Sequence, residues 1–354
     1  MTRSAIKPLQ LLSLAFINLV AFFTIDYIFG IFIEPPPIYL NTRNQYSTNY
    51  RNYFIEVKDK DGTYYSPDQS VPVDLVYEFE ELPKESLKVL AIGDSFTAGQ
   101  GVKRQDTWIK QLEKISTTKK TYGLNYGISG LNINEIKNVF DFVVPQKKSN
   151  LIIYALVLND IIPDKNAPLF LDVDEKNQYN KDTGIYYDFM NLRTIVFDRN
   201  RNDFLNFFNQ NFNIPKYIIN LYELKNITKK TIRFYQNLND PKVNALGLNQ
   251  TFDLINQMNE KSKLNQTDFM VMIFPLFFQT QKDYPFLSSH QYLKSQLALR
   301  NIKVLDLLPF YQGLKDSDLW VHPVDQHPNN EAHYIAATAL LNYLKNHTRH
   351  LSNK

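Results

Sequence analysis

The sequence predicts an α/β fold, in which helices pack on a parallel β-sheet. Short apolar runs alternate with segments of helical periodicity from residue 88 to residue 346, and this alternation is typical of βαβ units. The apolar runs are continuous, as in strands that are buried on both faces. Several runs end directly in polar residues, at the sheet edge where such folds bind ligands. The expected strands are 88–94, 120–126, 150–158, 268–275 and 303–308, and the expected helices are 104–117, 132–144, 286–299 and 330–346.

The first element is an apolar segment that we interpret as a membrane anchor. Residues 9–25 carry no charge, and after Asp26 the apolar run continues to Ile33, so the stretch approaches the ~20 residues that a membrane-spanning helix needs. Asp26 lies toward the end of the run, where the interface makes a charge less costly. Two basic residues precede the run, so the positive-inside rule places the N-terminus in the cytoplasm.

The rest of the chain is then expected outside the cytoplasm, in the periplasm or at the cell surface, with residues 9–33 as its contact with the membrane. The alternative is a signal peptide that is cleaved, which releases a secreted protein. However, Phe22–Ile25 offers no small-residue cleavage site.

The chain divides into three parts. Residues 1–34 contain the anchor, and residues 35–86, which begin with three prolines and are rich in Tyr and Asn, are expected to form a small β-rich extension. Residues 87–350 form the main domain. Within it, residues 161–266 interrupt the strand–helix alternation with amphipathic helical patterns. Structureless loops of that length are uncommon in compact domains, so this segment is predicted to be a helical insertion or lid beside the ligand crevice.

The most specific motif is Gly-Asp-Ser at residues 93–95, where the first strand ends. The glycine permits a sharp turn, and the small residues that follow let a helix start close behind it. The Ser95 hydroxyl therefore lies between the carboxyl end of a strand and the start of a helix. A serine in this position is a candidate nucleophile, provided that a base lies nearby. The structural alternative is an ordinary helix-cap serine.

The candidate base is His327, near the C-terminal end of the chain. An imidazole can accept the serine proton and return it later, because it titrates near neutral pH. Asp325 precedes it by two residues, and residues i and i+2 of an extended segment point to the same side. Asp325 can therefore orient the imidazole as the third member of a triad, with Asp316 and Asp318 as alternatives. A solvated loop carboxylate is the other interpretation of Asp325.

Two further residues are candidates for binding an oxyanion. Gly130 follows the second strand, and the N–H of a glycine can approach a substrate closely. Asn159 follows the third strand and carries a side-chain amide. Together with the backbone N–H of Ser95, these groups supply three donors around a tetrahedral intermediate. Each of the two is also compatible with a simple turn.

Four segments resemble, in order, the four blocks of SGNH (GDSL-type) hydrolases: Gly93-Asp94-Ser95, Ile128-Ser129-Gly130, Asn159-Asp160 and Asp325-Gln326-His327-Pro328. The resemblance covers roughly residues 87–344. It implies a flavodoxin-like three-layer α/β/α fold and ester chemistry, with the serine as nucleophile, the histidine as base, and Gly130 and Asn159 as oxyanion donors. Two positions depart from the pattern. Val157 stands where the third block carries a glycine, and Val324 occupies the usual place of the acid, for which Asp325 is the substitute.

The composition argues against several classes of function. A net charge of +3 is too small to indicate a nucleic-acid partner. The absence of cysteine excludes a disulfide framework and thiol chemistry. His322, His327 and His333 invite a metal interpretation, but no cysteine or carboxylate cluster supports it, so we expect neither a metal nor another cofactor.

Three functions remain. The first is an exported serine esterase that hydrolyses acyl esters, with acetyl esters as one candidate, of a carbohydrate or lipid through an acyl-enzyme on Ser95. The second is an O-acyltransferase that uses the same triad to modify a cell-envelope polysaccharide. The third is a catalytically weak binding or scaffold protein, which the departures at Val157 and Val324 motivate.

Overall fold

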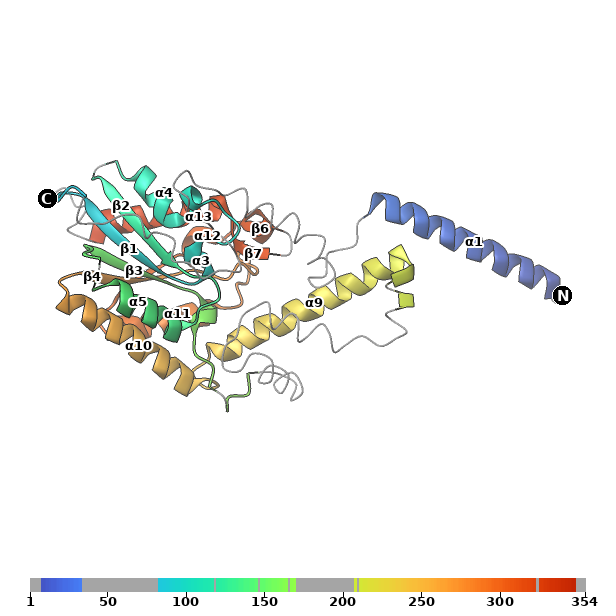
Figure 1. The fold of residues 1–354 in the computed structure, drawn as a ribbon. Helices are drawn as coiled ribbons and strands as arrows, with labels where there is room; N and C mark the ends of the chain where they lie inside the picture. Colours follow the sequence, from blue (N-terminus) through green and yellow to red (C-terminus); the bar gives the residue numbers. More distant parts are fainter. Residues whose placement is uncertain are drawn as a thin grey trace.

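A computed structural model describes residues 8–33, 82–169 and 207–347, apart from positions 118, 146, 165, 209, 323 and 324. Its centre is a five-stranded sheet in the order β2-β1-β3-β4-β5 (Figure 1). All neighbouring strands in this sheet run parallel. This is the flavodoxin-like, doubly wound order, so the predicted fold class is confirmed. The strands are β1 (Leu87–Gly93), β2 (Thr121–Gly127), β3 (Leu151–Leu156), β4 (Asp268–Ile273) and β5 (Lys303–Asp306).

The strands form because their apolar runs are covered on both sides. Every residue of β3 is buried, and so is every residue of β4 after Asp268. A strand with no exposed face reads as a continuous apolar run rather than an alternating one, which is the pattern in the sequence.

Helices cover both faces of the sheet, as Figure 1 shows. On one face α4 (Trp108–Ile115) packs against α13 (Asn330–His347), and the short α12 (Leu308–Tyr311) contacts α13. On the other face α5 (Ile133–Val143) packs against α10 (Ala245–Leu264), and α11 (Leu287–Leu299) packs on β5. The result is the expected three-layer arrangement.

The predicted insertion 161–266 contains two long helices in its described part. One of them, α10, contacts both α5 and β4, and its Phe252, Ile255 and Met258 are fully buried. It is therefore a layer of the fold rather than a lid. The other, α9 (Asn213–Leu238), extends away from the sheet toward α1 (Pro8–Phe32) (Figure 1). Residues 170–206 of the insertion and residues 35–81 of the predicted β-rich extension lie outside the described residues.

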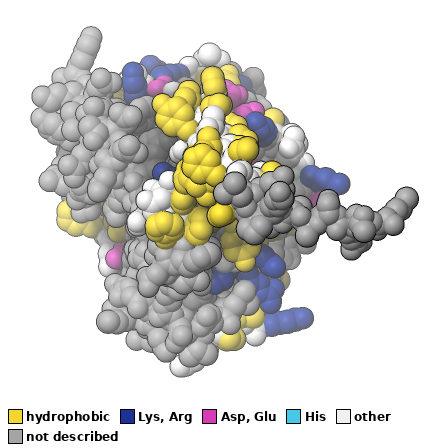
Figure 2. Space-filling model, turned by 90° about the vertical axis from the view of Figure 1, so that its right-hand side faces the viewer, with side chains coloured by type: hydrophobic (Ala, Val, Ile, Leu, Met, Phe, Trp, Pro, Cys, Tyr) yellow, Lys and Arg dark blue, Asp and Glu magenta, His cyan; other side chains and the backbone are white. Residues whose placement is uncertain are grey.

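The helix α1 differs from the others because most of its apolar side chains are exposed. Its segment Leu12–Phe32, with a mean hydropathy of 2.0, is long and apolar enough to cross a membrane. Among the residues that the structure describes, α1 is the one helix with this property. Figure 2, which views the molecule from the α1 side of Figure 1, shows hydrophobic side chains gathered in a strip on that face.

Candidate active site

Ser95 lies where β1 gives way to a helix, as the sequence predicts. The strand ends at Gly93, and the four-residue helix α3 (Ser95–Ala98) begins two residues later. The Asp94 side chain caps this helix, since its Oδ1 accepts the backbone N–H of Phe96 at 2.9 Å. The Ser95 side chain is held at the carboxyl edge of the sheet and is almost completely buried.

His327 and Asp325 lie on an antiparallel hairpin formed by β6 (Trp320–His322) and β7 (Asp325–Pro328). The sequence predicts an extended segment here but not its pairing with β6. The indole N–H of Trp320 donates to the Phe277 carbonyl at 3.2 Å and ties the hairpin to the segment after β4. The backbone N–H of Asn329 donates to the Leu319 carbonyl at 2.9 Å. The histidine therefore extends from a fixed strand.

The three predicted triad side chains lie together in one chain of contacts. The Nε2 atom of His327 is 2.8 Å from the Ser95 Oγ, and the Nδ1 atom of the same ring is in short contact with the Asp325 Oδ1. The same carboxylate oxygen accepts the backbone N–H of His327 at 3.1 Å. A ring that donates from Nδ1 leaves Nε2 free to accept the serine proton. The arrangement can thus activate a hydroxyl.

The alternative acids lie elsewhere. The Asp316 side chain accepts the backbone N–H groups of Gln279 and Thr280, at 2.5 and 2.8 Å. Asp318 is exposed and forms an ion pair with Lys315 at 3.8 Å. Within the part of the chain that the structure describes, the carboxylate at the His327 ring is that of Asp325.

Aromatic rings pack against the histidine of the candidate triad. The Phe96 ring is 5.5 Å from the His327 ring, measured between centroids, and it stacks on Phe277 at 6.3 Å. Phe274 meets the same ring edge-on at 5.8 Å. These apolar groups fix the orientation of the imidazole and exclude water from its buried side, which strengthens electrostatic contacts there.

Asn159 and Ser95 both contact the side chain of Asp94, the residue that directly precedes the serine. Asn159 belongs to the short helix η3 (Leu158–Asp160), and its Nδ2 donates to the Asp94 Oδ2 at 3.0 Å. The Ser95 Oγ is 3.3 Å from the same oxygen. A primary amide has two N–H donors, so one remains for a substrate oxygen while the other holds the side chain in place. Asp94 is thus a positioning candidate.

Asp94 and Asp160 are both buried at this edge. Burial raises the pKa of Asp94, although the hydrogen bonds from Asn159 and the Phe96 N–H act in the opposite direction. Burial also raises the pKa of Asp160 well above its ordinary value, and the nearby charge of Asp94 adds to the rise. The Asp160 Oδ2 accepts the Tyr154 hydroxyl at 2.8 Å and the Val157 N–H at 3.0 Å. These bonds hold the turn that carries the Asn159 amide.

Gly130 lies in the turn between β2 and α5, at the same sheet edge as Ser95. Its φ of 85° is in the left-handed region, where side chains other than glycine are strained. The backbone N–H of Ile128, at the start of this loop, donates to the Gly93 carbonyl at 3.1 Å. The loop with Gly130 is therefore joined to the end of β1 that leads to the serine.

His333 is a packing residue. It is fully buried in α13, and its Nδ1 accepts the backbone N–H of Trp108 at 3.2 Å. Burial and the charge of His327 lower the pKa of His333 to about 3, so the ring is neutral at neutral pH. It joins α13 to the start of α4.

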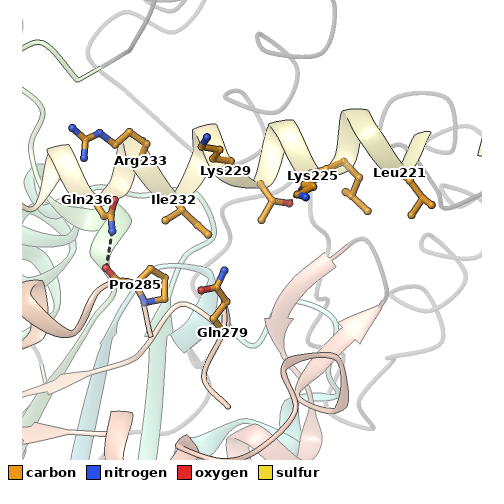
Figure 3. Close-up of a pocket in the computed structure, with 10 residues that line it drawn as sticks. Leu221, Lys225, Lys229, Ile232, Arg233, Gln236, Gln279 and Pro285 are labelled. Atoms are coloured by element: carbon orange, nitrogen blue, oxygen red, sulfur yellow. Dashed lines mark hydrogen bonds between the residues drawn. The ribbon is translucent and has the colours of Figure 1, made fainter. Parts of the chain in front are cut away.

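A cavity of about 1070 Å³ lies between α9 and the segment from Gln279 to Pro285 (Figure 3). The side chains of Leu221 and Ile232 extend from α9 toward this space, and the basic residues Lys225, Lys229 and Arg233 also line it. The Gln236 side chain closes one end by donating to the Pro285 carbonyl at 2.9 Å. Because Gln279 follows Phe277 by two residues, the cavity wall is continuous with the segment that stacks on Phe96.

Comparisons with known proteins give matches among solved structures. No family model and no curated protein matches the chain. A catalytic mutant of Axe2, an acetylxylan esterase from Geobacillus stearothermophilus, is 14% identical, with 76% of this chain and 97% of that chain covered and a TM-score of 0.41. A member of the lipolytic protein G-D-S-L family from Veillonella parvula DSM 2008 is 14% identical, with coverages of 73% and 97% and a TM-score of 0.37. TesA is 13% identical, with coverages of 73% and 98% and a TM-score of 0.39.

These identities and TM-scores describe a distant similarity of the backbone fold. In its backbone fold, the chain is similar to solved G-D-S-L lipolytic proteins and to an acetylxylan esterase.

Proposed function

We propose that the chain is an SGNH-type serine hydrolase that cleaves ester bonds, with Ser95 as nucleophile, His327 as base and Asp325 as the residue that orients the base. The observation that carries this proposal is the unbroken contact from the Ser95 Oγ through both ring nitrogens of His327 to Asp325. A helix-cap serine needs no such relay, because capping uses only the hydroxyl.

The proposed reaction has two halves. In the first, the Ser95 Oγ forms a bond to the ester carbonyl carbon while its proton passes to the His327 Nε2. The bond to the alcohol oxygen then breaks, and the imidazolium returns the proton to the departing alcohol. In the second half His327 deprotonates a water molecule, which attacks the acyl-enzyme. The acid leaves and the Ser95 hydroxyl is restored.

The oxyanion that forms in each half needs donors. The Asn159 amide, which the Asp94 carboxylate holds from behind, supplies one of them, and the backbone N–H groups of Ser95 and Gly130 supply the others. Donors that are fixed before the reaction stabilise developing charge without reorganisation at the moment of reaction. The link from Asn159 to Asp94 supports this role.

The substrate class is inferred from the cavity between α9 and the segment from Gln279 to Pro285, which follows Phe277 by two residues in the sequence. Its apolar side chains on α9 and the large volume suit an ester whose acyl or alcohol part is much larger than acetate. A carbohydrate or lipid ester meets that description. Together with α1 as a retained membrane span, this supports an exported enzyme that acts at the cell envelope.

The test is covalent labelling of the full-length protein in detergent with a fluorophosphonate probe, which reacts with activated serines. We expect labelling of the wild type and of Ser317→Ala, an exposed serine that serves as the matched control, and none of Ser95→Ala. Absence of labelling in folded wild-type protein would overturn the proposal and favour a binding or scaffold role.

A second measurement separates water from other acyl acceptors. Turnover of an aryl acetate is followed with and without oligosaccharides, and the products are analysed by mass. Free acetate as the product supports the esterase. An acylated oligosaccharide that requires Ser95 would overturn the hydrolase assignment in favour of an O-acyltransferase with the same nucleophile.

A further inference from the structure

The helix α1 contains a buried carboxylate. Asp26 is only 5% exposed, whereas its neighbours Ile25 and Tyr27 are 58% and 69% exposed. A carboxylate in a membrane-spanning segment is costly unless it is paired or faces protein. The partner of Asp26 therefore shows which side of α1 is turned toward the rest of the chain.

That partner is the beginning of α9. The backbone N–H of Ile214 donates to the Asp26 Oδ1 at 2.7 Å, and the backbone N–H of Asn213 donates to the Oδ2 at 3.0 Å. The first N–H groups of a helix have no intrahelical acceptor, and Phe212, at the N-cap position of α9, provides no side-chain cap. Asp26 thus caps a helix that begins 187 residues later in the chain.

The surrounding contacts are specific to this pairing. The Phe212 ring lies 5.8 Å from Phe22 and 5.9 Å from Phe23, between centroids. The Asn213 side chain fills the space above Gly30, where a Cβ atom would come within 2.5 Å of it. The small residue lets the two helices approach closely, as in membrane helix pairs.

The depth of this contact follows from the length of α1. Asp26 lies six residues before Phe32, the last residue of α1, which is about 9 Å at 1.5 Å per residue. If α1 spans the bilayer, the start of α9 then lies below the membrane surface. Exposed apolar side chains before and along the start of α9 suit that position, since Phe207, Ile218 and Tyr222 are 55%, 60% and 70% exposed.

We propose that residues 207–222 are a second membrane element, embedded beside α1 at the boundary between headgroups and acyl chains and locked to it by the Asp26 carboxylate. The occupant of their exposed apolar face is lipid. The inference rests on the membrane span in the proposed function. It makes α1 a permanent part of the fold rather than a removable leader. The 26-residue α9, about 39 Å long, then connects this membrane element to the part of the chain that packs on the sheet.

The first experiment tests the helix pair by cross-linking in native membranes. The chain contains no cysteine, so Phe23→Cys with Phe212→Cys gives a clean pair for oxidation, and Ile17→Cys with Phe212→Cys is the matched control. We expect an intramolecular disulfide in the first pair only. Asp26→Ala in the same background reduces its yield severalfold, and Asp26→Asn, which keeps one acceptor oxygen, retains most of it.

The second experiment tests lipid contact in phospholipid vesicles. An environment-sensitive fluorophore is attached at Ile218→Cys or, as control, at Leu264→Cys, which is 84% exposed at the end of α10. Lipids brominated along the acyl chain are expected to quench the first fluorophore severalfold more than the second. Equal quenching at the two positions would overturn the proposal.

Further outcomes are decisive against it. A disulfide between two chains would assign the face to a second copy, and a mature protein that lacks residues 1–33 by mass would exclude a retained α1. Fluorophosphonate labelling of every variant is measured in parallel. Because it reports on Ser95 alone, absence of the disulfide from the Phe23→Cys and Phe212→Cys pair that retains Asp26, with intact labelling, refutes the membrane element, and loss of labelling with an intact cross-link refutes the hydrolase.

Discussion

The Nε2 atom of His327 lies 2.8 Å from the Oγ of Ser95, although the two residues are 232 positions apart in the chain. One is at the start of α3, directly after β1, and the other is on the hairpin strand β7. Their meeting depends on the parallel sheet and on the Trp320 contact that fixes the hairpin.

Ser95→Ala and His327→Ala are each expected to reduce aryl acetate turnover by a factor of about 10⁴ or more, because the nucleophile and base act as a unit. Combining them should cost little more than either alone, and the thermal unfolding midpoint should stay close to that of the wild type. Additive losses in the double variant would show that the two side chains do not share a step.

Asp325→Asn tests the orienting carboxylate. An amide at this position no longer favours the tautomer with the proton on Nδ1, and in serine proteases the matching change lowers kcat by about 10⁴. The exposed Asp318→Asn is the control and should leave kcat unchanged. A wild-type kcat in Asp325→Asn would remove Asp325 from the proposed triad.

Asn159→Ala is expected to lower kcat by about 10²–10³, with a smaller effect on KM, as for the loss of one oxyanion donor. Asp94→Ala should act in the same direction but more weakly, because Asp94 only positions the amide. Asp94→Asn retains an acceptor for Asn159 and should recover most of the activity. The readout is steady-state kinetics, and a rise in KM alone would argue for substrate binding instead.

Asp160→Asn tests the buried acid. Since burial raises the Asp160 pKa above 3.8, the folded protein holds this proton more tightly than the unfolded chain. Stability therefore falls as the pH rises from about 4 through the raised pKa. The variant lacks this titration, so its free energy of unfolding relative to wild type should increase by about 1.4 kcal/mol per pH unit in that window.

Chemical denaturation between pH 4 and pH 8 measures this difference. The exposed Asp253→Asn on α10 is the control and should show no such trend. A difference between Asp160→Asn and wild type that stays constant with pH would contradict a raised pKa.

Ile232→Trp tests the cavity against α9 (Figure 3). The indole ring is larger than the isoleucine side chain and fills part of the cavity, so KM for a long-chain or oligosaccharide ester should rise roughly tenfold. Aryl acetate, which is small, should be turned over as before. Leu246→Trp, at an exposed position on α10, is the matched control. An equal loss for both substrates would indicate general damage rather than a substrate cavity.

The sequence predicted the sheet and its helices within a few residues. The apolar run at β1 was expected over 88–94 and occupies Leu87–Gly93, and the helix expected over 286–299 occupies Leu287–Leu299. Strands that are buried on both faces are readable from sequence because burial demands apolar residues at every position. The β6–β7 hairpin was missed, because Trp320–His322 is short and lacks that pattern.

The candidate site was only partly readable. The serine, histidine and aspartate were identified because reactive side chains followed strands or lay two residues apart in an extended segment. The bond from Asn159 to Asp94 had no counterpart in the sequence, since the two residues are 65 positions apart. The separation of α9 from α10 was missed as well, because both helices have similar amphipathic patterns and only packing distinguishes them.

By itself, the sequence determined which segments are strands and helices, where the chain is apolar enough to enter a membrane, and which side chains are candidates for the proposed ester cleavage. Those properties are local, because they depend on residue type and on spacing along a few turns or strands. Only the tertiary structure decided that Asp325 rather than Asp316 meets His327, that Asp94 holds Asn159, and that Asp26 caps α9. The residues of each of these longer-range pairs lie far apart in the sequence. The local spacing of residue types therefore does not reveal their contacts, which form only when the chain folds.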